Sequence, residues 1–173
     1  MITEDGYILT VHRIKNRTSM AANGEKAYPV FFMHGIEDSS FSWVQNTPSL
    51  APAFVFADAG FDVWLGNNRG NVYSQSHTSL DPSQKEFWDF DFEEMGLYDV
   101  PACADYILEK TKGTNPIDKI AAYIGFSEGT TQFFIGSSMK PDYFASKFNL
   151  YVAWAPIVHL SNTSFIGTIS QYD

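Results

Sequence analysis

The order of apolar and polar segments predicts an α/β protein with a mostly parallel sheet and helices on both faces. The length of 173 residues fits one domain, and 45% apolar with 18% charged residues fits an ordinary globular chain. Four short apolar segments have the length and composition of buried strands: 29–33, 61–65, 120–124 and 149–155. Ligands of such sheets gather at the carboxyl ends of the strands, so we sought the functional residues there.

The first elements lie before residue 36. Residues 6–14 alternate moderately between apolar and polar side chains and predict a strand. Residues 15–28 are polar and predict a surface loop. The segment PVFFM at 29–33 then runs directly into His34 and Gly35, which is typical of a buried strand entering a turn.

A helix is expected next, between Thr47 and Ala59. Thr47 is a suitable N-cap, and Pro48 suits the first helical position because its missing N–H has no intrahelical partner there. Gly60 is expected to end this helix, since glycine adopts the left-handed conformation that closes many helices. The strand at 61–65 follows.

The second half continues the alternation. Residues 71–92 show no clear period and predict a long loop. Asp99 is expected to cap a helix with Pro101 in its first turn and Gly113 at its end. The remaining predicted elements are a strand at 120–124, a helix at 128–139 and a strand at 149–155.

Composition excludes several classes of function. The net charge is −9, from 11 Lys and Arg against 20 Asp and Glu, and an acidic chain without a basic run argues against nucleic-acid binding. A single cysteine, Cys103, excludes an internal disulfide framework and a cysteine-based zinc site. No apolar run approaches the roughly 20 residues of a transmembrane helix, and the N-terminal residues do not form a signal peptide.

The strongest local motif is Gly125-Phe126-Ser127-Glu128-Gly129. It has the pattern G-x-S-x-G, follows an apolar strand and precedes a predicted helix. In this context the serine sits on a sharp turn that exposes its hydroxyl above the sheet, and the glycines leave room for the neighbouring elements. Ser127 is therefore the candidate nucleophile.

A second motif supports the first. In hydrolases with such an elbow, a histidine-glycine turn after an early strand contributes a backbone N–H group to the oxyanion hole. Here that donor is the N–H of Ile36, and the second is the N–H of Glu128, the residue after the nucleophile. His34 itself is expected to be a buried histidine that braces the turn.

Longer segments carry a resemblance to a known family. The chain resembles the acid lipases of the α/β-hydrolase fold, which include the gastric and lysosomal acid lipases. The segments that carry this resemblance are ITEDGYILTVHRI at 2–14, FMHGI at 32–36, FADAGFDVWLGNNRGN at 56–71, EFWDFDFEEMGLYDVPA at 86–102, IGFSEGTTQFF at 124–134 and LYVAWAPI at 150–157.

This resemblance implies a lipid ester hydrolase, acting on triacylglycerols or sterol esters, that needs no metal and no organic cofactor. It implies that Ser127 forms an acyl-enzyme, with Ile36 and Glu128 as the oxyanion donors. It also implies a secreted or lysosomal location.

The family's remaining catalytic residues are not matched. The triad order is serine, acid, histidine, yet after Ser127 the chain offers only Asp142 and Asp173 as aspartates and His159 as the only histidine. Neither Asp142 nor His159 matches the family motif. We therefore expect residues 1–173 to be a partial hydrolase domain, truncated before the last strands and before the triad Asp and His.

The family typically carries glutamine where this chain has Glu128. A carboxylate there would oppose a developing oxyanion, since the two negative charges repel each other. The other interpretation is a first-turn glutamate that points to solvent and complements the helix dipole.

Three functions remain open at this point. The first is the lipid ester hydrolase. The second is a non-catalytic assembly or binding module, and the third is an enzyme that a second chain completes. In each case an unpaired edge at 149–155 is expected to favour self-association or a protein partner.

Overall fold

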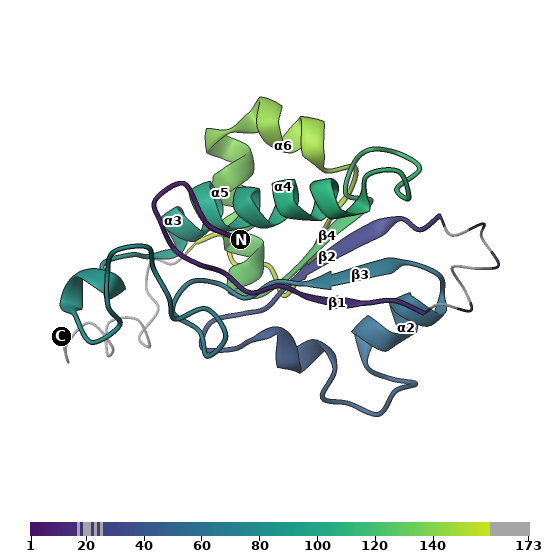
Figure 1. Cartoon of the computed structure of the whole chain (residues 1–173), viewed down its shortest axis with the longest axis horizontal. Coiled ribbons are helices and arrows are strands. Elements are labelled where there is room, and N and C mark those ends of the chain that lie inside the picture. The colour runs from purple at the N-terminus through teal and green to yellow at the C-terminus, as the bar shows by residue number, and fades with distance from the viewer. Residues whose placement is uncertain (17, 19–21, 23, 25, 160–173) are drawn as a thin grey trace.

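The computed structural model describes residues 1–16, 18, 22, 24 and 26–159. Its centre is a five-stranded sheet in the order β1 (His12–Ile14), β3 (Asp62–Leu65), β2 (Pro29–Met33), β4 (Ala122–Phe126) and β5 (Tyr151–Trp154). Figure 1 labels the first four of these strands side by side. β1 runs antiparallel to β3, and the other neighbouring pairs are parallel. The predicted α/β class with a mostly parallel sheet is therefore confirmed.

The strands are short and, in the middle of the sheet, fully buried. β2 and β3 have every residue buried, which matches their apolar sequences. β1 is shorter than the predicted segment 6–14, and β4 begins and ends later than the predicted segment 120–124.

Helices cover both faces of the sheet, as expected (Figure 1). Helix α2, Pro52–Asp58, packs its alanines on one face with Val30 and Phe32. The opposite face carries α4, α5 and α6, and its core is rich in aromatic side chains such as Phe31 and Tyr123. These helices span Val100–Thr111, Glu128–Met139 and Pro141–Lys147.

The helix between Thr47 and Ala59 starts later than the sequence predicts. Thr47 does not cap it; the N-cap is Ala51, and Pro52 occupies the first turn. Proline restricts the preceding residue to extended backbone, and Ala51 accordingly has φ −69° and ψ 120°. The helix therefore cannot run through Pro52, although Gly60 follows its end with φ +92° as expected.

The predicted N-cap at Asp99 is also wrong. The helical segment begins at α3, Phe92–Glu94, where Asp91 and Glu94 form a reciprocal capping box. It continues through the wider π-turn η3, Met95–Asp99, into α4. The end of the predicted loop 71–92 is thus helical, and that loop also contains the 3₁₀-helix η2, Lys85–Trp88.

Pro101 lies inside this helical segment without breaking it. Proline has no N–H to donate to the carbonyl of Leu97, four residues earlier. That carbonyl instead accepts a hydrogen bond from Lys140 Nζ at 2.8 Å, which ties η3 to the end of α5. Among the helices of the described residues, none is long and apolar enough to cross a membrane.

Candidate active site

Ser127 occupies the turn between β4 and α5 in a strained backbone conformation. Its φ of +52° and ψ of −116° lie where residues with a side chain are rarely found. Hydrogen bonds hold it there: its N–H donates to the carbonyl of Trp154 at 2.9 Å, and its carbonyl accepts from the N–H and hydroxyl of Thr130. Strain maintained by surrounding bonds is typical of active sites.

The two glycines of the motif are required by close backbone contacts. A Cβ on Gly125 would lie 2.6 Å from the carbonyl oxygen of Gly129, and one on Gly129 would lie 2.6 Å from that of Met33. Both distances are too short for any side chain. The elbow therefore packs the start of α5 directly onto the end of β2.

The histidine-glycine turn lies against the serine, as the sequence predicts. β2 and β4 are neighbouring parallel strands, so the turns that follow them meet at one edge of the sheet. A Cβ on Gly35 would lie 3.1 Å from Ser127 Cβ. In the described residues no hydrogen bond uses the N–H of Ile36, and the first N–H groups of α5 have no intrahelical acceptor.

His34 is buried and orients this turn. The backbone N–H of Asn68 donates to His34 Nε2 at 3.3 Å, so Nε2 must accept and the ring proton is assigned to Nδ1. Nδ1 then donates to the carbonyl of Gly35 at 2.7 Å. Because the Gly35–Ile36 peptide is trans, the N–H of Ile36 points away from that carbonyl. Burial lowers the pKa of His34, which keeps the ring neutral.

A cavity of about 590 Å³ opens beside the serine. Gly35, Ile36 and Glu128 form the part of its wall that flanks Ser127. The apolar lining residues are Ile36, Val72, Trp88, Phe90 and Met95, and the acidic ones are Glu37, Asp38 and Glu128. The volume and the mostly apolar wall are typical of a small-molecule site.

Glu128 is less exposed than the second interpretation of its carboxyl group, a side chain that points into solvent, would expect. The residue is half-buried and lines the cavity. Burial raises the pKa of Glu128 to about 7. The carboxyl group therefore changes charge near neutral pH rather than near pH 4.

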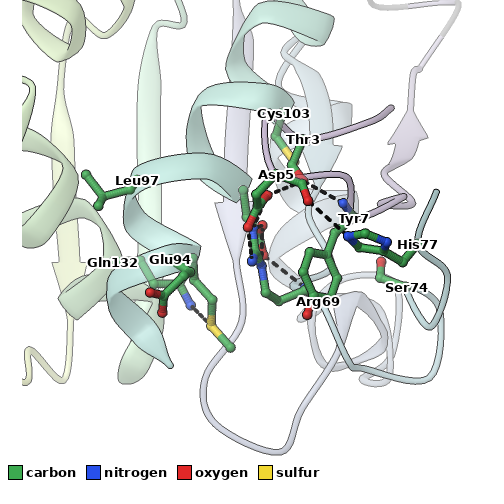
Figure 2. A network of polar contacts seen from close by, with 12 residues as sticks. Thr3, Asp5, Tyr7, Arg69, Ser74, His77, Glu94, Leu97, Cys103 and Gln132 are labelled. Atoms are coloured by element: carbon green, nitrogen blue, oxygen red, sulfur yellow. Dashed lines mark hydrogen bonds and ion pairs between the residues drawn. The ribbon is translucent and has the colours of Figure 1, made fainter. Parts of the chain in front are cut away.

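A buried ion cluster fixes the loop after β3, which forms another part of the wall. The guanidinium of Arg69 binds Asp99 through Nε at 2.8 Å and Asp5 through Nη2 at 2.9 Å, and it lies over the ring of Tyr7 (Figure 2). Burial raises the pKa of Asp99 to about 6 despite this pairing. The cluster joins the N-terminal segment, the loop that carries Asn68, and η3.

The structure does not bring a histidine to Ser127 within the residues it describes. His12 bonds Ser40, and His77 bonds the carbonyl of Asp5. His34 is bound to Gly35 and Asn68, and His159 is exposed with no hydrogen bond to Ser127.

Asp142 lies in the first turn of α6, beyond the end of α5 that is far from Ser127. Twelve helical residues separate the two ends by about 18 Å, so Asp142 cannot serve this serine.

The sequence analysis missed one segment of the site. The segment GNNRGN at 66–71 was assigned no role in the site, yet Asn68 and Asn71 contact His34 Nε2 and Arg69 is the centre of the ion cluster. Its position directly after a parallel strand was the available signal, because such positions line the ligand edge of the sheet.

In the described residues, no group of three or more His, Cys, Asp or Glu side chains could hold a metal ion.

The chain belongs to the α/β-hydrolase fold family. A family model described as alpha/beta hydrolase fold matches residues 28–147, and a second, described as a partial alpha/beta-hydrolase lipase region, matches residues 1–47. The elbow and the histidine-glycine turn lie within the first of these matches.

The resemblance to lipases of the gastric type is likewise confirmed. The chain is 41% identical over 167 residues to lipase member M of Mus musculus, covering 96% of this chain and 38% of that protein. It is 40% identical over 163 residues to gastric triacylglycerol lipase of Homo sapiens, covering 94% and 39%. The chain thus spans about two fifths of these relatives.

A solved structure shows the same fold at much lower identity. Epoxide hydrolase A from Mycobacterium thermoresistibile superposes with a TM-score of 0.56 at 17% identity. The match covers 98% of this chain and 43% of the other. At that identity the likeness supports the architecture and nothing finer.

Proposed function

We propose that this chain carries the nucleophile and the oxyanion hole of a lipid ester hydrolase. The observation that carries the proposal is Ser127, held at φ +52° between β4 and α5 with Gly35 packed against its Cβ. The lipases to which the chain is similar support esters of lipids as the substrate class. The apolar cavity beside the serine fits an acyl or alkyl chain.

The proposed reaction is acyl transfer through the serine. Ser127 Oγ attacks the ester carbonyl carbon, its proton passes to a general base, and the carbonyl electron pair moves onto oxygen. The N–H groups of Ile36 and Glu128 stabilise this oxyanion. When the intermediate collapses, the C–O bond to the alcohol breaks and the base returns its proton to the departing oxygen. Water, deprotonated by the same base, then attacks the acyl-enzyme, and the carboxylic acid leaves as Ser127 Oγ regains the proton. The base and its orienting acid are proposed to be residues other than those the structure describes.

Labelling with a fluorophosphonate tests the role of Ser127. In the protein that contains this chain, we expect the probe to modify Ser127, as found by mass spectrometry of the peptide spanning 120–140. The Ser127→Ala variant should lose this label. Ser138→Ala, an exposed serine on the same helix, should label like the unmodified protein.

Two results would contradict the proposal. A folded protein that the probe does not modify would instead favour the non-catalytic binding module. Equal labelling of the Ser127→Ala variant would place the nucleophile elsewhere.

We further infer from the gastric relatives that the protein is secreted or lysosomal, which localisation of the tagged full-length protein would test.

His34 provides a test of the oxyanion hole. His34→Ala removes the donor to the Gly35 carbonyl, so the Ile36 N–H loses its fixed direction. We expect kcat for ester hydrolysis to fall by about 100-fold, with KM little changed. His34→Asn places an amide N–H near the position of Nδ1 and should restore most of the rate. If alanine and asparagine reduce kcat equally, or neither reduces it, the hydrogen bond does not have this role.

β5 pairs only with β4 among the described residues, and Trp154 at its end is exposed. We therefore predict that the outer edge of β5 associates with a further strand or with a protein partner. Analytical ultracentrifugation would measure this association as an increase in molecular mass.

A further inference from the structure

Glu128 introduces an ionisable carboxyl group at the reacting centre of the proposed hydrolase. Its backbone N–H is one of the two proposed oxyanion donors, and the residue is half-buried and lines the cavity that flanks Ser127. In the described part of the chain this side chain forms no ion pair. Charge on the carboxyl group is therefore uncompensated where the oxyanion forms.

The charged and titratable groups around Glu128 do not supply a counter-charge. They are His34, Glu37 and Asp38 after β2, Arg69 after β3, Glu94 and Asp99 on α3 and η3, and Tyr123 on β4. Arg69 is already bound by Asp5 and Asp99, and burial keeps His34 neutral. Glu37 and Asp38 carry the same sign as a Glu128 carboxylate and therefore supply no counter-charge.

A neighbouring side chain suits the protonated form. Gln132 lies one turn further along α5, on the same helix face as Glu128. It is fully buried, and its Oε1 has no hydrogen-bond donor among the described residues. Its Nε2 donates to Met95 Sδ at 3.5 Å, and Met95 lines the same cavity as Glu128, so the amide group lies on the cavity side of α5. A neutral carboxyl group offers an O–H donor on that side, whereas a carboxylate offers none.

We propose that Glu128 is a residue of the reacting centre and that ester hydrolysis requires its carboxyl group to be neutral. This inference rests on the proposed function of Ser127. The tetrahedral intermediate places a negative oxygen between the N–H groups of residues 36 and 128. A second negative charge on the side chain of residue 128 raises the energy of that intermediate, because the two charges repel in a partly dehydrated site.

The decisive measurement is the pH profile of kcat/KM for a neutral, soluble ester. We expect the protein that contains this chain to lose activity above about pH 7, by up to tenfold for each further pH unit. Glu128→Gln keeps the shape of the side chain and cannot ionise. At pH 9 we therefore expect this variant to be at least about tenfold more active than the unmodified protein. Glu93→Gln, an exposed glutamate on α3, is the matched control and should leave the profile unchanged.

A second readout does not depend on turnover. Burial raises the pKa of Glu128 in the folded state above its ordinary value of 4.5, so the folded protein binds this proton more tightly than the unfolded chain. Stability therefore falls as pH rises from about 4.5 to about 7, and Glu128→Gln removes that loss. The Tm of the variant should exceed that of the unmodified protein by an amount that grows from about pH 5 to about pH 7 and levels off above it.

Each outcome decides the inference. An unchanged alkaline loss of activity in Glu128→Gln overturns it, and so does a Tm difference that is constant with pH. If Ser127→Ala still hydrolyses the ester at every pH, the proposed function fails instead. An inactive Ser127→Ala together with an unaltered Glu128→Gln profile overturns only the role of Glu128.

Discussion

Gly129→Ala is expected to disrupt both the fold around the elbow and the reactivity of Ser127. In a helix, alanine is ordinarily more favourable than glycine by about 1 kcal/mol. Here the added Cβ would lie 2.6 Å from the carbonyl oxygen of Met33 and 2.7 Å from that of His34. Both neighbours are main-chain atoms of a buried strand and its turn, so they cannot rotate away as a side chain could. The steric penalty therefore exceeds the gain in helix propensity.

We expect the free energy of unfolding to fall by about 1–3 kcal/mol, as measured by chemical denaturation. The rate of fluorophosphonate labelling should fall by at least about 100-fold, since a shift of α5 by about 1 Å moves one oxyanion donor relative to the other. Ser138→Ala, at an exposed position on the same helix, should change neither quantity. A Gly129→Ala protein that is more stable and fully reactive would show that the elbow tolerates a side chain there.

Arg69→Met is expected to be the most destabilising replacement of a charged residue. The Arg69 and Asp99 side chains are 1% and 0% exposed, so the variant would leave a buried carboxylate with no counter-charge. Removing one partner of a buried ion pair lowers the free energy of unfolding by about 3–5 kcal/mol. Denaturant titration at pH 8, where Asp99 is ionised, should reveal this loss.

The matched control is Lys147→Met, because Lys147 pairs with Asp105 at the surface, where 31% and 56% of the side chains are exposed. That pair should contribute less than about 1 kcal/mol. Adding Asp99→Leu to Arg69→Met should restore part of the lost stability, since the orphaned charge is then removed. Equal losses for Arg69→Met and Lys147→Met would contradict the structural importance of the cluster.

The elements whose structure depends on residues close to them in the chain were predictable from the sequence. The helix at 128–139 has the expected bounds, and the strand at 29–33 is likewise unchanged. Gly35 packs against Ser127 as the two motifs imply, because parallel strands bring their following turns to one edge. The roles of Ser127, Ile36 and Glu128 in catalysis remain proposals that the experiments above test.

The errors occurred where distant residues determine the local structure. Asp99 has the composition of an N-cap, but its carboxyl group is used by Arg69, thirty positions earlier in the chain. The helix at Pro141–Lys147 is missing from the predicted elements because seven residues are too few to show a clear period, although Pro141 suits a first helical position. Thr47 failed as a cap because Pro52 breaks the helix that it would have started.

The contact between α5 and the end of β2 has a practical consequence for protein engineering. The separation of the two proposed amide donors is set by main-chain contacts, so it does not depend on which side chains residues 36 and 128 carry. Random mutagenesis at those two positions should therefore yield variants with altered selectivity and working pH range while the catalytic scaffold survives. Libraries that also vary Gly125 or Gly129 should yield almost no active variants.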